Sequence, residues 1–346
     1  MPNTDPVCDN AAIAETVVGE GARVAKTEVI AAGSITQGLQ GGRLSAIGEM
    51  VHSPARVRMF TDDGRGVADS RLLRRAMEYI RGFGAICAEH CEDASLSEGS
   101  QMHEGAVSDF LGLKGVPAEA EEIALARDLA LAKLTGVHFH AQHVSTAGCV
   151  ELIRRARLQG VNVTAEVTPH HLCLTDAELV SYDPNFKVNP PLRPAGDVEA
   201  LRNALAEGLF DAVATDHAPH APQEKEAEFE SAPPGMVGLE TALAVMVTEV
   251  VGAGILSLAD AVRVMSASPA AVLGLRDQGG PVTEGSVANL TVFDPSASWT
   301  VDPNAFVSKS RNSPWAGRTL RGRVMHTVYR GRLVFSEDKQ ATEALA

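Results

Sequence analysis

The segment Asp211–His220 carries side chains capable of acid–base or metal chemistry directly after a short apolar run. The run Ala212–Ala214 predicts a buried strand, and Asp216, His217 and His220 follow it. A carboxylate and two imidazoles at the tip of a buried strand are costly as packing, because buried polar groups need partners. At the carboxyl end of a strand in an α/β barrel they have a use, since active sites are built there.

Three further predicted strands end in residues of the same kind. They are Asp62 and Asp63 after Val57–Phe60, His90 after Ala85–Ala88, and His143 after Val137–Gln142. Histidine and carboxylate together suit zinc or a similar divalent ion. Two such ions can share a hydroxide and activate it at neutral pH. A single strand-end histidine or Asp-Asp-Gly turn is more typical of a structural role, so the prediction rests on the strand ends together.

The remaining histidines outside these strand ends are predicted to be structural or on the surface. His138 and His140 alternate with His143 along one segment, so we expect them to face elsewhere. His52, His103 and His326 follow no predicted strand and are expected on the surface.

Helical and strand-like segments alternate over most of the chain. Helices are predicted at Asn10–Val24, Leu44–Met50, Ser70–Arg81, Ala118–Leu134, Ala147–Gln159 and Asp197–Glu207, and two more strands at Glu28–Ala32 and Val161–Val167. Strict alternation of this kind predicts a parallel sheet with helical crossovers. No glycine fingerprint of a nucleotide-binding fold follows any of the strands, so the pattern favours a (β/α) barrel.

The pattern changes after Pro269. Gly285–Asp294 predicts a turn and a strand, and Leu320–Phe335 predicts a β-hairpin that turns near Gly331. Because no helices separate these strands, we expect a small antiparallel layer beside the barrel. The predicted domains are therefore an incomplete barrel over residues 1–275 and a small β domain with a tail over residues 276–346.

Composition limits the partners and the compartment. The 346 residues carry a formal charge of −14, which argues against nucleic acid and anionic membranes as partners. Five scattered cysteines suit a reducing cytosol better than a disulfide framework. The chain has no apolar run of membrane-spanning length and no signal-peptide pattern at its start. These features predict a cytoplasmic protein that acts on a small molecule.

A series of motifs resembles class I dihydroorotase, an enzyme of pyrimidine synthesis in the amidohydrolase superfamily. In chain order the motifs are Met1–Thr4, Phe60–Gly64, His90–Asp93, His143–Thr146, Glu166–His171, Asn189–Arg193, Thr215–His220, Gly238–Thr241 and Ser308–Pro314. The resemblance covers nearly the whole chain. It implies a (β/α)8 barrel of the TIM type and hydrolysis of the cyclic amide of dihydroorotate to N-carbamoyl-L-aspartate.

The resemblance also implies a role for each matching residue. One aspartate of the pair Asp62 and Asp63, for preference Asp63, is expected to bridge two zinc ions, and His90 and His143 are expected to bind the second ion. Asp216 is expected to bind the first ion and to act as general base and acid, moving a proton from the attacking hydroxide to the leaving nitrogen.

The substrate-binding residues implied by the resemblance are Asn3, Asn189, His220 and Gly235. The loop from Ala218 to about Gly235 is expected to close over the substrate.

One feature of the family is missing. The family places a His-x-His pair, followed by a substrate-binding arginine, on the first barrel strand, and this chain starts at the motif that ends the second strand. The only His-x-His, His138-Phe139-His140, lies on another strand. We therefore expect a barrel that is incomplete at its N-terminal side, and little or no dihydroorotase activity from this 346-residue chain.

Two alternatives to an active dihydroorotase stay open. The first is a non-catalytic subunit related to dihydroorotase that scaffolds aspartate transcarbamoylase; the absence of the His-x-His pair favours it, and the retained His90, His143 and Asp216 disfavour it. The second is another cyclic amidase, such as allantoinase or hydantoinase. A homo-oligomer is a possible assembly in each case.

Overall fold

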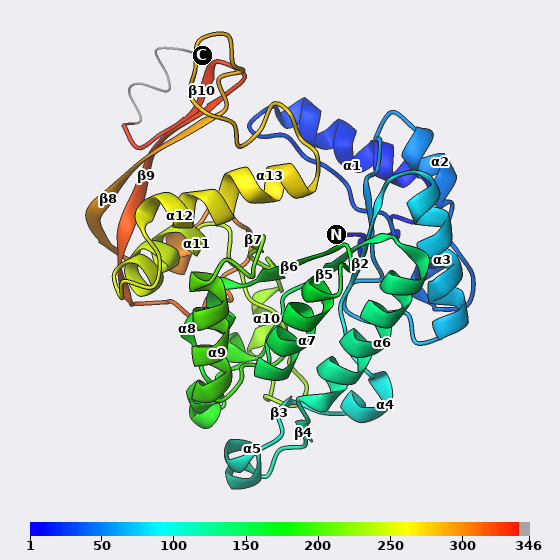
Figure 1. The fold of residues 1–346 in the computed structure, drawn as a ribbon. Coiled ribbons are helices and arrows are strands. Elements are labelled where there is room, and N and C mark those ends of the chain that lie inside the picture. The colour runs from blue at the N-terminus through cyan, green and yellow to red at the C-terminus, as the bar shows by residue number, and fades with distance from the viewer. Residues whose placement is uncertain (339–346) are drawn as a thin grey trace.

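A five-stranded parallel sheet forms the centre of the computed structural model, which describes residues 1–338 (Figure 1). Its spatial order is β1-β2-β5-β6-β7, and a single parallel bridge between Gly33 and Phe60 continues it beyond β1. The strands are β1 (Met59–Phe60), β2 (Ile86–Glu89), β5 (His138–Ala141), β6 (Val163–Val167) and β7 (Ala212–Val213). This arrangement confirms the predicted parallel barrel-type sheet. The strand predicted at Glu28–Ala32 was wrong, because only the bridge at Gly33 forms there.

Helices cover the outer face of this sheet. They are α1 (Ala11–Val24), α2 (Ile47–His52), α3 (Ser70–Gly82), α6 (Glu119–Thr135), α7 (Ala147–Leu158), α8 (Pro169–Cys173) and α9 (Ala195–Ala206). Apolar spacing explains how they dock. In α3, Leu73, Ala76, Met77 and Ile80 recur at three- and four-residue intervals and are all buried, while Asp69 caps the helix start.

The two faces of the strands differ in chemistry. Phe139 of β5 pairs with Val163 of β6, and both belong to the apolar core beneath the helices. Because side chains alternate along a strand, His138, His140 and Glu166 point to the opposite, inner face. The inner face is therefore polar and leads to the carboxyl ends of the strands.

A separate antiparallel sheet follows the barrel strands. Its order is β10-β9-β8, with β8 (Leu290–Thr300), β9 (Thr319–Tyr329) and β10 (Arg332–Ser336). The β9–β10 hairpin turns at Arg330-Gly331, where both residues have positive φ (50° and 79°), as a two-residue hairpin loop requires. This confirms the predicted antiparallel layer. The exact boundary at residue 275 stays a prediction, and the tail from residue 339 onward lies outside the described residues.

Smaller elements connect the two sheets and line the loops. Along the chain they are α4 (Ala94–Ser97), β3 (Met102–His103), α5 (Ala106–Leu111), β4 (Gly115–Val116), α10 (Pro222–Lys225), α11 (Ala242–Val245), α12 (Leu258–Val262) and α13 (Ser268–Val272). Figure 1 shows α11 and α12 between the central strands and the antiparallel sheet. A second apolar cluster, which includes Val245, Trp315 and Leu320, packs the base of β9 against α11.

Candidate metal-dependent active site

Three of the predicted ligands meet at the carboxyl ends of the central strands. Asp63 lies three residues beyond β1, His90 directly follows β2, and His143 lies two residues beyond β5. One ligand atom from each lies within 4.8 Å of the other two, and all three residues are buried. Among residues 1–338 these three residues form the one cluster of at least three histidine, cysteine or acidic side chains that could hold a metal ion. The parallel topology explains it, because such strands end at one edge.

The two imidazoles face each other. Nδ1 of His90 lies 3.0 Å from Nε2 of His143, and the same Nε2 lies 3.7 Å from Oδ1 of Asp63. Nε2 of His90, its second ring nitrogen, lies 3.0 Å from Oε2 of Glu92. Metal-binding histidines commonly use their second nitrogen in this way, because a carboxylate fixes the ring and its tautomer. Glu92 was not predicted as a site residue, although it lies two positions after His90.

This donor set fits a divalent cation. Imidazole and carboxylate are ligands of zinc, and Nδ1 of the buried His143 has no hydrogen-bond partner among the described residues. Burial lowers the pKa of His143, but the hydrogen bond and charge of Asp63 and the charge of Asp216 outweigh it and raise the pKa to about 9. Two carboxylates thus give this site a strong preference for positive charge.

The neighbouring aspartates Asp62 and Asp63 have different surroundings. Oδ1 of Asp62 accepts hydrogen bonds from the backbone N–H groups of Ile35 (2.8 Å) and Thr36 (2.9 Å), and Oδ2 accepts one from the Thr36 hydroxyl. Asp62 is therefore occupied in fixing the segment at residues 35–36. Asp63 points to the histidines, and Nδ2 of Asn3 lies 3.4 Å from its Oδ2. Burial opposes ionisation of Asp63, but His143 and His90 lower its pKa.

Asp216 lies beside this group but is not one of its three members. It lies three residues beyond β7, and its charge interacts with those of His143, Asp63 and His90. Burial raises its pKa in spite of the nearby histidines. Both Asp216 and His143 have positive φ (44° and 31°), a backbone conformation that is uncommon for residues other than glycine and that clusters at functional sites.

Two of the predicted substrate-binding residues lie at the same site. Asn3 contacts Asp63, as described above, and Asn189 donates from Nδ2 to Oε2 of Glu92 at 2.7 Å. The same Nδ2 lies 3.2 Å from Nε2 of His90. A cavity of about 350 Å³ opens beside them, and Glu92, Asn189 and Lys187 are among its lining residues.

The other two predicted substrate-binding residues, His220 and Gly235, lie together on the loop that follows β7. Nε2 of His220 lies 2.9 Å from the carbonyl oxygen of Pro234. Two buried lysines hold this loop: Lys225 donates to the carbonyl of Gly235 at 3.0 Å, and Lys187 donates to that of Phe229 at 2.7 Å. These lysines were not predicted from the sequence. The closing motion predicted for the loop stays a prediction.

The remaining histidines are placed as follows. His138 and His140 bond to Thr164, and His140 also contacts Glu166 at 3.1 Å, so both are occupied within the inner face. The prediction that His103 lies on the surface was wrong. It is 8% exposed, and Arg193 donates a hydrogen bond to its Nδ1 at 3.0 Å. The error arose because His103 ends the short strand β3, which was not predicted, since the sequence around it has no clear strand pattern.

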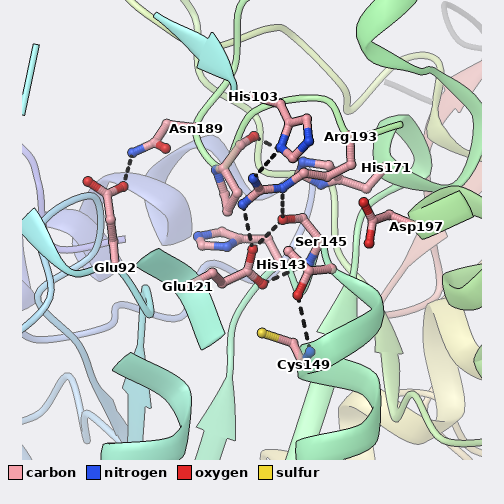
Figure 2. Close-up of polar contacts among 12 residues, drawn as sticks. Glu92, His103, Glu121, His143, Ser145, Cys149, His171, Asn189, Arg193 and Asp197 are labelled. Atoms are coloured by element: carbon pink, nitrogen blue, oxygen red, sulfur yellow. Dashed lines mark hydrogen bonds and ion pairs between the residues drawn. The ribbon is translucent and has the colours of Figure 1, made fainter. Parts of the chain in front are cut away.

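Figure 2 shows a polar network of Arg193, Glu121 and Ser145 close to His143. Arg193 forms an ion pair of 3.1 Å with Glu121, and its Nε donates to the hydroxyl of Ser145 at 3.0 Å. The side chains of Arg193 and Glu121 are only 2% and 6% exposed. No local pattern predicts this pairing, since the two residues lie 72 positions apart.

Comparison with known proteins defines the class first. The model of the amidohydrolase family matches residues 24–334, so the chain belongs to the amidohydrolase family. The structure of L-hydantoinase (dihydropyrimidinase) from Arthrobacter aurescens is similar with a TM-score of 0.85 and 26% identity, covering 97% of this chain and 76% of that one.

Sequence relatives then narrow the group. The chain is 49% identical to a dihydroorotase of Pelotomaculum thermopropionicum, over 97% of this chain and 78% of the relative. It is 48% identical to a dihydroorotase of Mycobacterium tuberculosis, over 98% of this chain and 79% of the relative. Within the amidohydrolases, the chain belongs with the dihydroorotases. None of the helices in residues 1–338 combines the length and the apolar character that crossing a membrane requires.

Proposed function

We propose that this chain acts as a zinc-dependent dihydroorotase, which hydrolyses the cyclic amide of (S)-dihydroorotate reversibly to N-carbamoyl-L-aspartate. The observation that carries the proposal is the buried group of Asp63, His90 and His143 at the carboxyl ends of the strands. Identity of 48–49% with dihydroorotases, against 26% with a hydantoinase of similar fold, favours this substrate over other cyclic amides.

Asp63, His90 and His143 would hold the cation. A bound zinc ion supplies Lewis acidity and lowers the pKa of water, which are the two requirements for attack on an unreactive amide. Glu92 keeps the His90 ring oriented through its 3.0 Å contact. Burial pulls the pKa of Glu92 upward, but the hydrogen bonds of His90, Ser97 and Asn189 and the charge of His90 outweigh it and hold the pKa at about 2. Glu92 therefore stays an acceptor throughout the reaction.

Asp216 is the residue that would move the proton. It lies beside the three donors without being tied to them, and burial raises its pKa toward the range that suits a general base. In the forward direction Asp216 takes a proton from the attacking water and gives it to the ring nitrogen as the C–N bond breaks. In the reverse direction it takes the proton from that nitrogen.

Asn3, Asn189, His220 and Gly235 would bind the substrate. The amide groups of Asn3 and Asn189 are already directed at the site, where they contact Asp63 and Glu92. These N–H donors suit the carboxylate and carbonyl oxygens of dihydroorotate. The loop with His220 and Gly235 would form the opposite wall, braced by Lys187 and Lys225.

Residues 1–338 offer one three-donor group, so we propose one tightly bound zinc ion per chain. With only one well-held cation, we expect turnover by this chain to be low compared with a two-metal site, in which both ions activate the water. Cytoplasmic location stays a prediction. Association with a second copy or with aspartate transcarbamoylase is also a prediction, and sedimentation can test it.

A matched pair of variants tests the function. Asp216→Asn should abolish dihydroorotate hydrolysis while zinc, measured by elemental analysis, remains bound. Asp109→Asn, on the exposed surface of α5, should behave like the unmodified chain. A substrate panel with hydantoin and allantoin separates the related amidases. Binding of zinc with no hydrolysis of any of these compounds would instead support a non-catalytic subunit, and undiminished activity of the Asp216 variant would remove it from the mechanism.

A further inference from the structure

A buried ion pair lies between two of the loops that build the site. Arg193 follows the Asn189 loop, and Glu121 lies in the first turn of α6. Their side chains approach to 3.1 Å and are almost fully buried. A buried ion pair costs much desolvation free energy, so its presence calls for a specific purpose beyond stability.

Each of the three nitrogens of the Arg193 guanidinium has a different partner. Nη2 donates to Oε2 of Glu121, Nε donates to the Ser145 hydroxyl at 3.0 Å, and Nη1 donates to Nδ1 of His103 at 3.0 Å. Burial, followed by the positive charge of Arg193, lowers the pKa of His103 to about 4, so its imidazole is neutral and can accept. The planar guanidinium thus connects three separate segments in a fixed geometry, as lysine could not.

Glu121 completes the network from the other side. Its Oε1 accepts from the backbone N–H of Ser145 at 2.9 Å, and its Oε2 also accepts from the Ser145 hydroxyl. Ser145 is therefore held by both members of the ion pair, through its backbone and its side chain. Figure 2 shows these contacts meeting at Ser145, next to His143.

The segment held in this way directly follows a strained residue. His143 has φ of 31°, and such a conformation persists only when the surroundings determine it. The backbone N–H of Val144 donates to the carbonyl of Glu166 at 2.9 Å, and that of Ala147 donates to Asp197 at 2.8 Å. Together with the contacts of Ser145, these hydrogen bonds from β6, α6 and α9 fix the segment that follows His143.

The same arginine also fixes the loop on its own side. Arg193 is four residues after Asn189, whose amide contacts both Glu92 and His90. One ion pair therefore connects the loop that aims His143 with the loop that supports His90.

We propose that Arg193 and Glu121 are positioning residues, which hold the His143 and Asn189 loops in the geometry that binds the metal ion. The proposal rests on the proposed function only in taking His90 and His143 as ligands. Neither residue belongs to the three-donor group; both would act through Ser145 and the loops on either side.

The test measures binding of zinc alone, using the metal-free chain and a competing chromophoric chelator. Arg193→Lys keeps the charge but loses the fork, and Ser145→Ala removes the shared hydroxyl while it keeps the ion pair. Each should weaken zinc binding by about 10- to 100-fold, the range typical of residues that orient ligands. The matched controls Glu122→Gln and Arg155→Lys, which line the groove between α6 and α7, should bind zinc like the unmodified chain.

Circular dichroism and thermal melting show which of the variants are folded. If Arg193→Lys does not fold, Ser145→Ala decides the question alone. A folded Ser145→Ala or Arg193→Lys chain that melts earlier but binds zinc with unchanged affinity would show a merely structural role and overturn the proposal. A zinc affinity that falls as expected supports the proposal even if no variant, nor the unmodified chain, hydrolyses dihydroorotate; that result would count against the proposed function only.

Discussion

The adjacent residues Asp62 and Asp63 should respond to the same substitution in opposite ways. Asp62 accepts three hydrogen bonds from Ile35 and Thr36, whereas Asp63 points to the two histidines. We therefore expect Asp62→Asn to reduce stability with little change in zinc binding. We expect Asp63→Asn to reduce zinc binding with little change in stability.

The cost of Asp62→Asn follows from its partners. An amide oxygen can keep the two backbone N–H groups, but hydrogen bonds to a neutral acceptor are weaker, by roughly 0.5 kcal/mol each. The amide nitrogen cannot accept from the Thr36 hydroxyl, which loses about 1 kcal/mol. That hydroxyl already accepts from the backbone N–H of Gly41 at 3.0 Å, and if it also accepted from the new amide its own O–H would lose the acceptor that Asp62 provides. The free energy of unfolding should fall by about 2 kcal/mol.

The metal-free chains are compared by urea denaturation and the zinc affinities by chelator competition. Measured above pH 9, where His143 is neutral and its charge no longer attracts Asp63, Asp63→Asn should change the free energy of unfolding by less than about 1 kcal/mol, since it loses no short hydrogen bond. It should weaken zinc binding by more than about 100-fold, because loss of a ligand exceeds loss of a residue that orients one. The reverse outcome, with zinc binding lost in the Asp62 variant and kept in the Asp63 variant, would refute the assignment of the ligand.

Three further variants test the surroundings of the site. Glu92→Gln should weaken zinc binding by about 10- to 100-fold because the His90 ring loses its charged acceptor. The control Glu98→Gln, on the exposed side of the same loop, should leave zinc binding unchanged. Equal zinc affinities of these two variants would contradict the role of Glu92. Gly235→Ala should lower the melting temperature and raise KM, since φ is 136° and an added Cβ would lie 2.7 Å from the nearest side-chain carbon. Gly208→Ala, with φ of 76° but open space around the added Cβ, should lower the melting temperature less. Equal decreases in melting temperature would show that crowding at Gly235 is irrelevant. Burial, followed by the charge of Lys187, lowers the pKa of Lys225 from 10.5 to about 8. Between pH 8 and 10.5 the unfolded chain therefore binds more protons than the folded chain, and the stability should rise with pH relative to that of Lys225→Met. Parallel profiles of melting temperature against pH for the two chains would contradict this.

Most of the local elements, and the strand ends that carry the candidate ligands, were predicted from the sequence itself. The alternation of helical and strand-like segments predicted α3 and α6, and short apolar runs ending in Asp63, His90 and His143 predicted where candidate ligands would gather. These signals are local, because a helix or strand buries a face whose residues follow one another at fixed intervals. Parallel topology then brings the carboxyl ends of the strands together, whatever the details of the loops.

Only the tertiary structure decided how these ligands are supported. Which aspartate faces the histidines depends on hydrogen bonds from a segment 26 residues away, and the partner of Arg193 lies 72 positions before it. His103 shows the same limit, since it is buried by contacts that no local pattern records. Sequence periodicity reports which face of an element is apolar, but the pairing of buried polar groups depends on which loops meet in space, and that is set by the packing of the whole barrel.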